Sequence, residues 1–204
     1  MDFFPIFMNL KHRQCLVVGG GKVAARKISL LLKAQAQVQV VAPELCSEVS
    51  EMAQRGEIKH IARVFKDNDL QNEVLIIAAT GDSETNQRVS ELAKAKSLPV
   101  NVIDQPHLCS FIMPSIVDRS PIQIAISTGG SSPVLARLLR TRLESYIPAA
   151  YGRLAQLVDE FRTRVIEKFS DTSQRRYFWE KVLEGRVTEL MFSGNEHAAK
   201  QELE

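Results

Sequence analysis

The sequence has few of the residues that crosslink small proteins or bind structural metals. Only three cysteines occur among its 204 residues, Cys15, Cys46 and Cys109, and they form no C-x-x-C pair. The four histidines are dispersed along the chain. An odd number of isolated cysteines argues against a disulfide framework and a zinc-finger site, and it is typical of a reducing compartment.

Long apolar runs and an excess of one charge are also missing. No stretch approaches the roughly 20 apolar residues that a membrane-spanning helix needs, and residues 1–5 lack the basic segment of a secretory signal. Lys and Arg number 26 against 24 Asp and Glu, for a net charge of +2. We therefore expect a cytoplasmic protein that has neither nucleic acid nor a membrane as its partner.

Apolar residues, in contrast, are abundant enough for a buried core, at 45% of the chain. Short apolar runs alternate with helical patterns over the first hundred residues. The predicted strands are residues 14–18, 38–41, 58–61, 74–78 and 100–103, and helical patterns start near 22 and span about 44–55 and 84–96. This alternation predicts an α/β fold, a Rossmann-like parallel sheet with helices on both faces.

The pattern changes after Asp104, where three prolines interrupt the alternation. Residues 122–126 alternate like a half-exposed strand, and from Pro133 onward the pattern is helical, with breaks near Pro148, Asp171 and Gly194. We predict a Rossmann domain over 1–113, a small strand-helix dimerisation region over 114–147 and a C-terminal helical region over 148–204. The segment 110–146 offers a strand and a helix without a partner in the sheet, so we expect a homodimer that uses it.

A glycine-rich turn follows the first apolar run and precedes the first helix. It reads Gly19-Gly20-Gly21-Lys22-Val23-Ala24, a G-x-G-x-x-A form of the dinucleotide fingerprint. Gly19 permits the tight turn, Gly21 lets the backbone approach a pyrophosphate, and Ala24 allows close packing of helix on strand. We predict that residues 19–24 bind a dinucleotide through the helix N-terminus; an ordinary glycine-rich turn is the alternative.

The end of the second strand bears on the choice of cofactor. Ala42-Pro43-Glu44 stands where NAD-binding domains usually place an acidic residue, although Glu44 is displaced from that position. No arginine occupies this corner to bind a 2′-phosphate, so the pattern modestly favours NAD over NADP, with Pro43 and Glu44 as contacts. An ordinary carboxylate in the first turn of a helix explains Glu44 equally well.

A carboxylate follows the last predicted parallel strand, in Asn101-Val102-Ile103-Asp104. Ligands of open α/β sheets bind outside the carboxyl ends of the strands, so we predict that Asp104 faces the nicotinamide. It would act in acid-base catalysis or ligate a metal ion; a capping or turn aspartate is an alternative of equal weight. His107 lies three residues on, and its role stays open.

A second glycine-rich turn, Ser127-Thr128-Gly129-Gly130, leads through Ser131 and Ser132 to Pro133 at a helix start. We predict an anion-binding site here, because guanidinium groups suit carboxylates and five arginines lie nearby with a single acid among them. These arginines are Arg119, Arg137, Arg140, Arg142 and Arg153. A capped turn beside a solvated helix face is the alternative.

Taken together, these segments resemble the precorrin-2 dehydrogenase and sirohydrochlorin ferrochelatase family. The resemblance covers practically the whole chain and is most specific from Ser110 to Arg137. Its other segments are Phe4-Pro5-Ile6-Phe7, the fingerprint, Ala78-Ala79-Thr80, Asn101 to Asp104 and the aromatic stretch near Trp179. It implies NAD-dependent oxidation of precorrin-2 to sirohydrochlorin, insertion of ferrous iron in bifunctional members, and an intertwined homodimer.

The resemblance also implies roles for single residues. Asp104 becomes the essential carboxylate of both reactions and a contact for iron, and Thr80 becomes a cofactor contact. The turn from Ser127 to Gly130, with Arg137, matches the region beside the tetrapyrrole pocket. Thr128 stands where relatives often carry serine, and His107 stands where close relatives carry lysine.

Two other functions compete with this interpretation. A nucleotide sensor without catalytic activity would use the same fingerprint but would need neither Asp104 nor Arg137. A short-chain reductase would need a Tyr-x-x-x-Lys pair on a helix. Only Tyr177 and Lys181 have that spacing, and they lie far beyond the nucleotide-binding half, so we consider the match accidental.

Overall fold

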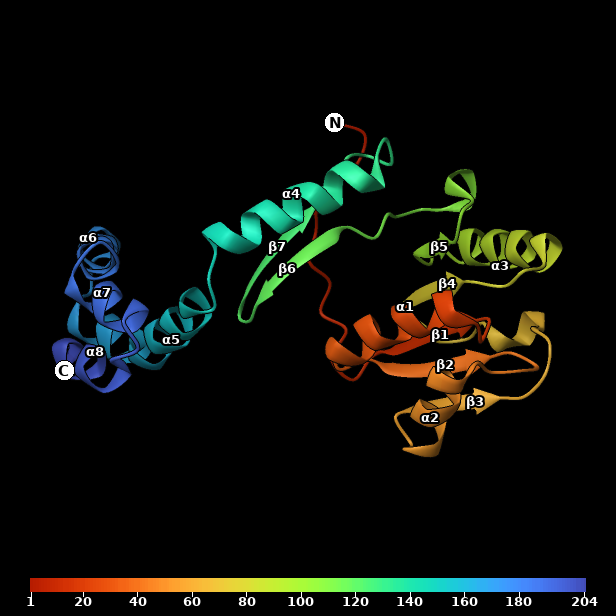
Figure 1. The fold of residues 1–204 in the computed structure, drawn as a ribbon, viewed down its shortest axis with the longest axis horizontal. Coiled ribbons are helices and arrows are strands. Elements are labelled where there is room, and N and C mark those ends of the chain that lie inside the picture. The colour runs from red at the N-terminus through yellow and green to blue at the C-terminus, as the bar shows by residue number, and fades with distance from the viewer. The chain divides into compact units, whose positions relative to one another are not determined.

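The structure, a computed structural model, describes all 204 residues. The chain divides into two units, Met1–Met113 and Pro114–Glu204, which run from red to green and from green to blue in Figure 1. The finer division of the second unit at residue 147 stays a prediction.

A parallel five-stranded sheet forms the centre of the first unit (Figure 1). Its strands lie in the order β3-β2-β1-β4-β5, and every neighbouring pair is parallel. They span β1 Gln14–Val18, β2 Gln37–Val41, β3 Ile58–Ile61, β4 Leu75–Ala78 and β5 Val100–Val102. Strands β1, β4 and β5 are buried on both faces, as the inner strands of parallel sheets require, whereas the edge strand β3 buries only Ile58.

Helices cover both faces of this sheet. They are α1 Lys22–Lys33, α2 Ser47–Gln54 and α3 Ser83–Ala95, with short 3₁₀ turns η1 Asp67–Asp69 and η2 Pro106–Leu108. Successive strand residues belong to different core clusters: Val17 packs with Ile28 of α1, and Val18 packs with Val89 of α3. This alternation is the period of a strand buried on both sides, and it confirms the predicted Rossmann-like α/β fold.

Helix α2 begins at Ser47, three residues later than the expected start near Glu44. The reason lies in the preceding loop, where the Cys46 amide donates a hydrogen bond to Gly20 O at 2.8 Å. This bond holds the backbone against the glycine-rich turn until residue 46, so the helix starts only after it.

The second unit contains an antiparallel hairpin and five helices. The hairpin joins β6 Ser115–Arg119 to β7 Ile122–Ile126. The helices are α4 Pro133–Tyr146, α5 Ala150–Lys168, α6 Thr172–Leu183, α7 Arg186–Phe192 and α8 Glu196–Leu203. A small core of Leu154, Leu157, Phe161, Val187, Met191 and Ala199 connects the last helices. The expected breaks near 148, 171 and 194 are present, whereas β6 and the break at Gly185 were not predicted.

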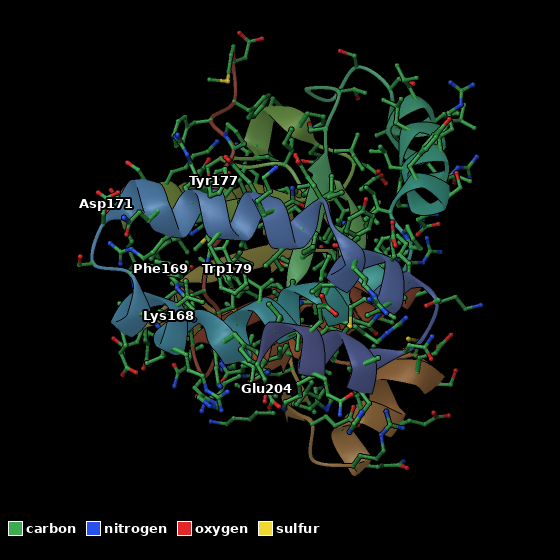
Figure 2. All side chains as sticks on the ribbon, turned by 90° about the vertical axis from the view of Figure 1, so that its left-hand side faces the viewer. Lys168, Phe169, Asp171, Tyr177, Trp179 and Glu204 are labelled. Atoms are coloured by element: carbon green, nitrogen blue, oxygen red, sulfur yellow. The ribbon has the colours of Figure 1, made fainter.

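The aromatic stretch of α6 packs only in part. Trp179 and Phe178 are half-buried, and the rings of Phe178 and Phe169 lie 5.5 Å apart. Figure 2 shows Trp179 and Phe169 between α5 and α6, with Tyr177 on the other side of α6. Tyr177 is 63% exposed, because the helix turns it away from the core.

Candidate functional site

The first two glycines of the turn after β1 bring neighbouring loops together. Gly19 has a φ of +117°, and a Cβ there would lie 2.3 Å from Ala79 O of the loop after β4. A Cβ on Gly20 would lie 2.3 Å from Glu44 O of the loop after β2. Only glycine fits at either position. The role predicted for Gly19 in the turn therefore extends to packing. Gly20, for which no separate role was predicted, packs in the same way.

The third glycine, Gly21, faces open space instead. A Cβ there would meet no atom within 4 Å. Gly21 is the N-cap of α1, no side chain caps this helix end, and its first turn carries no acidic residue. First-turn amides of a helix lack partners inside the helix and form its positive end, so this terminus fits a pyrophosphate. Lys22 and Val23 are exposed beside it, and Ala24 is fully buried.

The corner after β2 is fixed by an adjacent strand. Nε2 of His60 on β3 donates a hydrogen bond to Ala42 O at 2.9 Å. Pro43 and Glu44 follow and are exposed. Glu44 precedes α2, whose first-turn acid is Glu48, so the alternative of a first-turn carboxylate is wrong for Glu44. No feature of the sequence predicts that His60 supports this corner.

The loop after β4 carries Thr80, which Asn86 of α3 holds. The Thr80 hydroxyl donates to Asn86 Oδ1 at 2.9 Å, and Asn86 Nδ2 donates to Thr80 O at 3.1 Å. Ala79, the residue before Thr80, lies directly against Gly19, so this loop packs on the fingerprint. Thr80 thus lies just beyond the carboxyl end of β4, next to the fingerprint.

Asp104 lies two residues after β5 in a tight turn. Its φ is +58°, a left-handed conformation that aspartate tolerates better than most residues, and its side chain is exposed. The thiol of Cys109 closes this turn: it accepts a hydrogen bond from Val102 N at 3.1 Å and donates to Val102 O at 3.2 Å. The turn holds Asp104 at the carboxyl edge of the sheet, where the sequence placed it.

Lys27 of α1 contributes a positive charge near Asp104. Burial is the main cause that lowers the pKa of Lys27, and Arg26 lowers it further. Attraction by Asp104 and Cys109 acts in the opposite direction. The sequence did not single out Lys27, because a lysine within an amphipathic helix resembles any solvated lysine.

No contact in the structure supports a role for His107 or metal binding by Asp104. The His107 side chain is exposed in η2, and no hydrogen bond joins it to Asp104. Nowhere in the chain do three His, Cys, Asp or Glu side chains gather as a metal-binding group. The metal role of Asp104 therefore stays a prediction.

In the second unit, the hydroxyl groups of the turn before α4 bond within the turn itself. Thr128 Oγ1 accepts from Ser132 N at 3.0 Å, and Ser127 Oγ accepts from Gly129 N at 3.1 Å. Ser132 caps α4 by accepting from the Leu135 amide at 3.2 Å. The capped turn that we considered as an alternative is thus present. Gly129 and Gly130 have φ values of +65° and +90°, so their backbone needs glycine.

Three of the five arginines considered for anion binding already have partners within this unit. Arg119 Nε donates to Ile147 O at 2.8 Å, Arg140 pairs with Glu144 at 2.6 Å, and Arg153 pairs with Glu196 at 2.7 Å. The remaining two, Arg137 and Arg142, are exposed and form no ion pair. They are the arginines left for a carboxylate ligand.

Family models match three consecutive parts of the chain. Residues 6–115 match a family described as putative NAD(P)-binding. Residues 119–146 match the central region of sirohaem biosynthesis proteins, and residues 150–204 match the sirohaem synthase dimerisation region. These matches confirm the resemblance drawn from the motifs.

Curated relatives and a solved structure agree with these matches. Proteins named siroheme synthase are 61% identical in Thioalkalivibrio sulfidiphilus over 204 residues and 55% identical in Nitrosospira multiformis over 208 residues. Each alignment covers 100% of this chain but only 42% and 44% of the relative, so the chain spans less than half their length. The solved structure of SirC, a precorrin-2 dehydrogenase, matches with a TM-score of 0.77 and 26% identity over 98% of both chains. No helix is both long enough and apolar enough to cross a membrane.

Proposed function

This chain belongs to the putative NAD(P)-binding family whose model matches residues 6–115, and on that premise we propose that it is an NAD-dependent dehydrogenase that oxidises precorrin-2 to sirohydrochlorin. The observation that carries the proposal is the arrangement of three loops at one edge of the sheet. The glycine turn follows β1, Thr80 follows β4 and Asp104 follows β5, on three adjacent strands. Similarity to SirC over nearly all of both chains supports the substrate.

The residues around the glycine turn would hold the cofactor. The backbone of Gly19, Gly20 and Gly21 and the first turn of α1, Lys22 to Ala24, would bind the pyrophosphate, and Thr80 would border the nicotinamide half. When bound, NAD supplies the acceptor for the hydride that leaves the macrocycle.

The corner formed by Pro43 and Glu44 favours NAD over NADP. The Glu44 carboxylate would bind ribose hydroxyls and repel a 2′-phosphate. Arg63, which follows β3, does not provide a free guanidinium for that phosphate. Both oxygens of Asp69 accept its hydrogen bonds, at 2.7 and 2.5 Å.

Asp104 would accept the proton that balances the reaction. Precorrin-2 loses a hydride to NAD and a proton to a base, which yields sirohydrochlorin and NADH. A carboxylate positioned at the reacting edge is suited to that transfer, which contributes typically about 10² to 10⁴ in rate. Lys27 is close enough to interact electrostatically with this carboxylate.

The substrate would bind through its carboxylates. The turn of Ser127, Thr128, Gly129 and Gly130 and the unpaired guanidinium of Arg137 belong to this proposed contact surface. The family descriptions of the second unit include a dimerisation region, and we propose a homodimer as the active form.

A second activity, insertion of ferrous iron into sirohydrochlorin, is favoured by the name siroheme synthase of the relatives. Iron is here a substrate that replaces two pyrrole protons. Asp104 would accept a pyrrole proton and would be the contact for iron.

One set of assays tests these proposals. Purified protein with precorrin-2 and NAD should yield the absorption spectrum of sirohydrochlorin, and NADP should substitute poorly. Asp104→Asn keeps the size of the side chain and removes its basicity. We expect it to lower kcat at least about 100-fold and to leave the Kd for NAD, measured by calorimetry, unchanged.

Each alternative has its own outcome. NAD binding without turnover by the wild type would favour the nucleotide sensor. Full activity of Asp104→Asn would move the proton acceptor elsewhere, with His107 examined first. Sirohydrochlorin with ferrous or cobaltous ion, assayed separately, tests whether chelation also depends on Asp104.

A further inference from the structure

Helix α3 buries two polar side chains on the face that packs against the sheet. The buried residues of this helix are Asn86, Val89, Ser90 and Ala93. Asn86 is 3% exposed and Ser90 is 1% exposed. Burial of a polar side chain is unfavourable unless hydrogen bonds compensate for it, so the partners of these two residues show what they do.

Asn86 bonds to the loop after β4 with both ends of its amide. Oδ1 accepts from the Thr80 hydroxyl at 2.9 Å, and Nδ2 donates to Thr80 O at 3.1 Å. This loop is the one that presses on Gly19, where Thr80 N would lie 3.1 Å from an added Cβ. Asn86 therefore fixes the loop against the glycine turn.

Ser90 bonds to the loop after β5. Its hydroxyl donates to Leu108 O at 2.6 Å. Leu108 ends the 3₁₀ turn that follows Asp104, and the next residue, Cys109, bonds back to Val102. The segment from Val102 to Cys109 is thus a closed loop with Asp104 inside it, and Ser90 ties that loop to α3.

We infer that α3 positions both halves of the proposed site, with Asn86 holding the cofactor loop and Ser90 holding the Asp104 loop. The two residues are four apart, so they lie on one helix face about one turn from each other. One helix thus holds two loops, and each hydrogen bond serves the group that its own loop carries: the cofactor contact Thr80 for Asn86, and the proton acceptor Asp104 for Ser90. Both are positioning residues, and this inference rests on the proposed dehydrogenase function.

The inference predicts a separation of binding from turnover. Asn86→Ala frees the cofactor loop, so the Kd for NAD should rise about tenfold while kcat at saturating NAD stays within about twofold. Ser90→Ala frees the Asp104 loop, so kcat should fall about tenfold while the Kd for NAD is unchanged. Calorimetry and steady-state rates with precorrin-2 measure both quantities.

Val89→Ala is the matched control, because Val89 is fully buried on the same helix and makes apolar contacts only. It should lower the melting temperature without changing either quantity. If Asn86→Ala and Ser90→Ala behave like Val89→Ala, or if each variant changes Kd and kcat together, the two residues are only structural and the inference is wrong.

Hydrogen exchange provides a readout that does not depend on turnover. In the full chain, Asn86→Ala should speed amide exchange in residues 79–82, and Ser90→Ala should speed it in residues 103–109. A wild-type protein that binds NAD but does not oxidise precorrin-2 would refute the proposed function. The exchange results would then still show whether Asn86 and Ser90 position the two loops. Unchanged exchange in both segments would overturn the inference itself.

Discussion

The sheet of the first unit differs from the hairpin and α4 of the second unit in how completely it buries its apolar residues. In Met1–Met113 the strands β1 and β4 are almost wholly buried between two core clusters. In Pro114–Glu204 the hairpin has one buried residue, Val117, and α4 has one, Ala136. Exposed residues of α4 include Val134, Leu135, Leu138, Leu139 and Tyr146.

This difference separates a sheet that its own helices cover from a helix that leaves an aliphatic face uncovered. A parallel sheet closed by helices on both faces has its core complete, and such rigidity suits the positioning of cofactor and acid-base groups. A helix with several exposed aliphatic residues marks an interaction surface. The exposed face lies within the part of the chain that matches sirohaem biosynthesis proteins, next to the part that matches a dimerisation region.

Matched glycine substitutions should produce the largest effects and should damage one unit each. Alanine at Gly19 would combine a φ of +117° with a Cβ 2.3 Å from Ala79 O. We expect a loss of stability above about 3 kcal/mol and loss of NAD binding, with self-association retained. Gly152 of α5 is its counterpart, because a Cβ there would lie 2.4 Å from Arg119 O. Gly152→Ala should abolish self-association and retain NAD binding.

Thermal melting, calorimetry with NAD and sedimentation measure these outcomes. Gly21→Asp is the control for the first unit: it should fold normally, because the position is open, and yet lose NAD binding, because a carboxylate would meet the pyrophosphate. Loss of both properties in either alanine variant would show that the units do not fold independently.

A charge on the exposed face of α4 should have the next largest effect. Leu138 is 51% exposed on this helix. If the face is the homodimer interface, Leu138→Asp places a carboxylate in it, and the sedimenting mass should fall from about twice 22.9 kDa to 22.9 kDa. NAD affinity should not change.

Val64→Asp supplies the comparison within the first unit, because Val64 is 64% exposed there. It should leave the dimer intact. Wild-type protein that sediments as a monomer at high micromolar concentration would contradict the proposed homodimer, and a dimeric Leu138→Asp would place the interface elsewhere.

Much of the first unit was predictable because its signals are local. The run from Val74 to Ala78 is continuous and apolar, as in any strand buried on both faces, and the fingerprint fixes the turn before α1. Strand β6 was missed because Ser115-Ile116-Val117-Asp118-Arg119 buries only Val117. It is a strand because its backbone pairs with β7, and pairing of this kind leaves little trace in a half-exposed sequence.

The candidate site also has a part that could be predicted from the sequence and a part that could not. Spacing along the chain was enough to place the glycine turn and Asp104 at the ends of their strands. The supporting interactions were not predictable, since Ser90 bonds to Leu108 across 18 residues and the charge of Asp104 acts on Lys27 from another element. Such interactions depend on how the helices pack on the sheet, and no local sequence pattern specifies that packing.

The smallest expected effect concerns the stability of the first unit in acid. Hydrogen bonds from the Arg63 guanidinium hold the pKa of Asp69 below its ordinary value, against the opposing effect of burial. The folded pKa therefore lies below the unfolded value of about 3.9. The stability that this carboxylate contributes is present above about pH 4 and is lost as the pH falls through the folded pKa.

Asp69→Asn should thus lower the melting temperature by about 2–4 °C at pH 7 and by less at pH 3, because the wild type has then begun to lose the same interaction. Melting curves taken between pH 7 and pH 2.5 measure the difference. Asp159→Asn, the same substitution at an exposed position of the second unit, should leave the curves unchanged. A constant difference between Asp69→Asn and wild type at every pH would show that the Asp69 contact does not depend on its charge, and the pair with Arg63 would then contribute through shape and neutral hydrogen bonds alone.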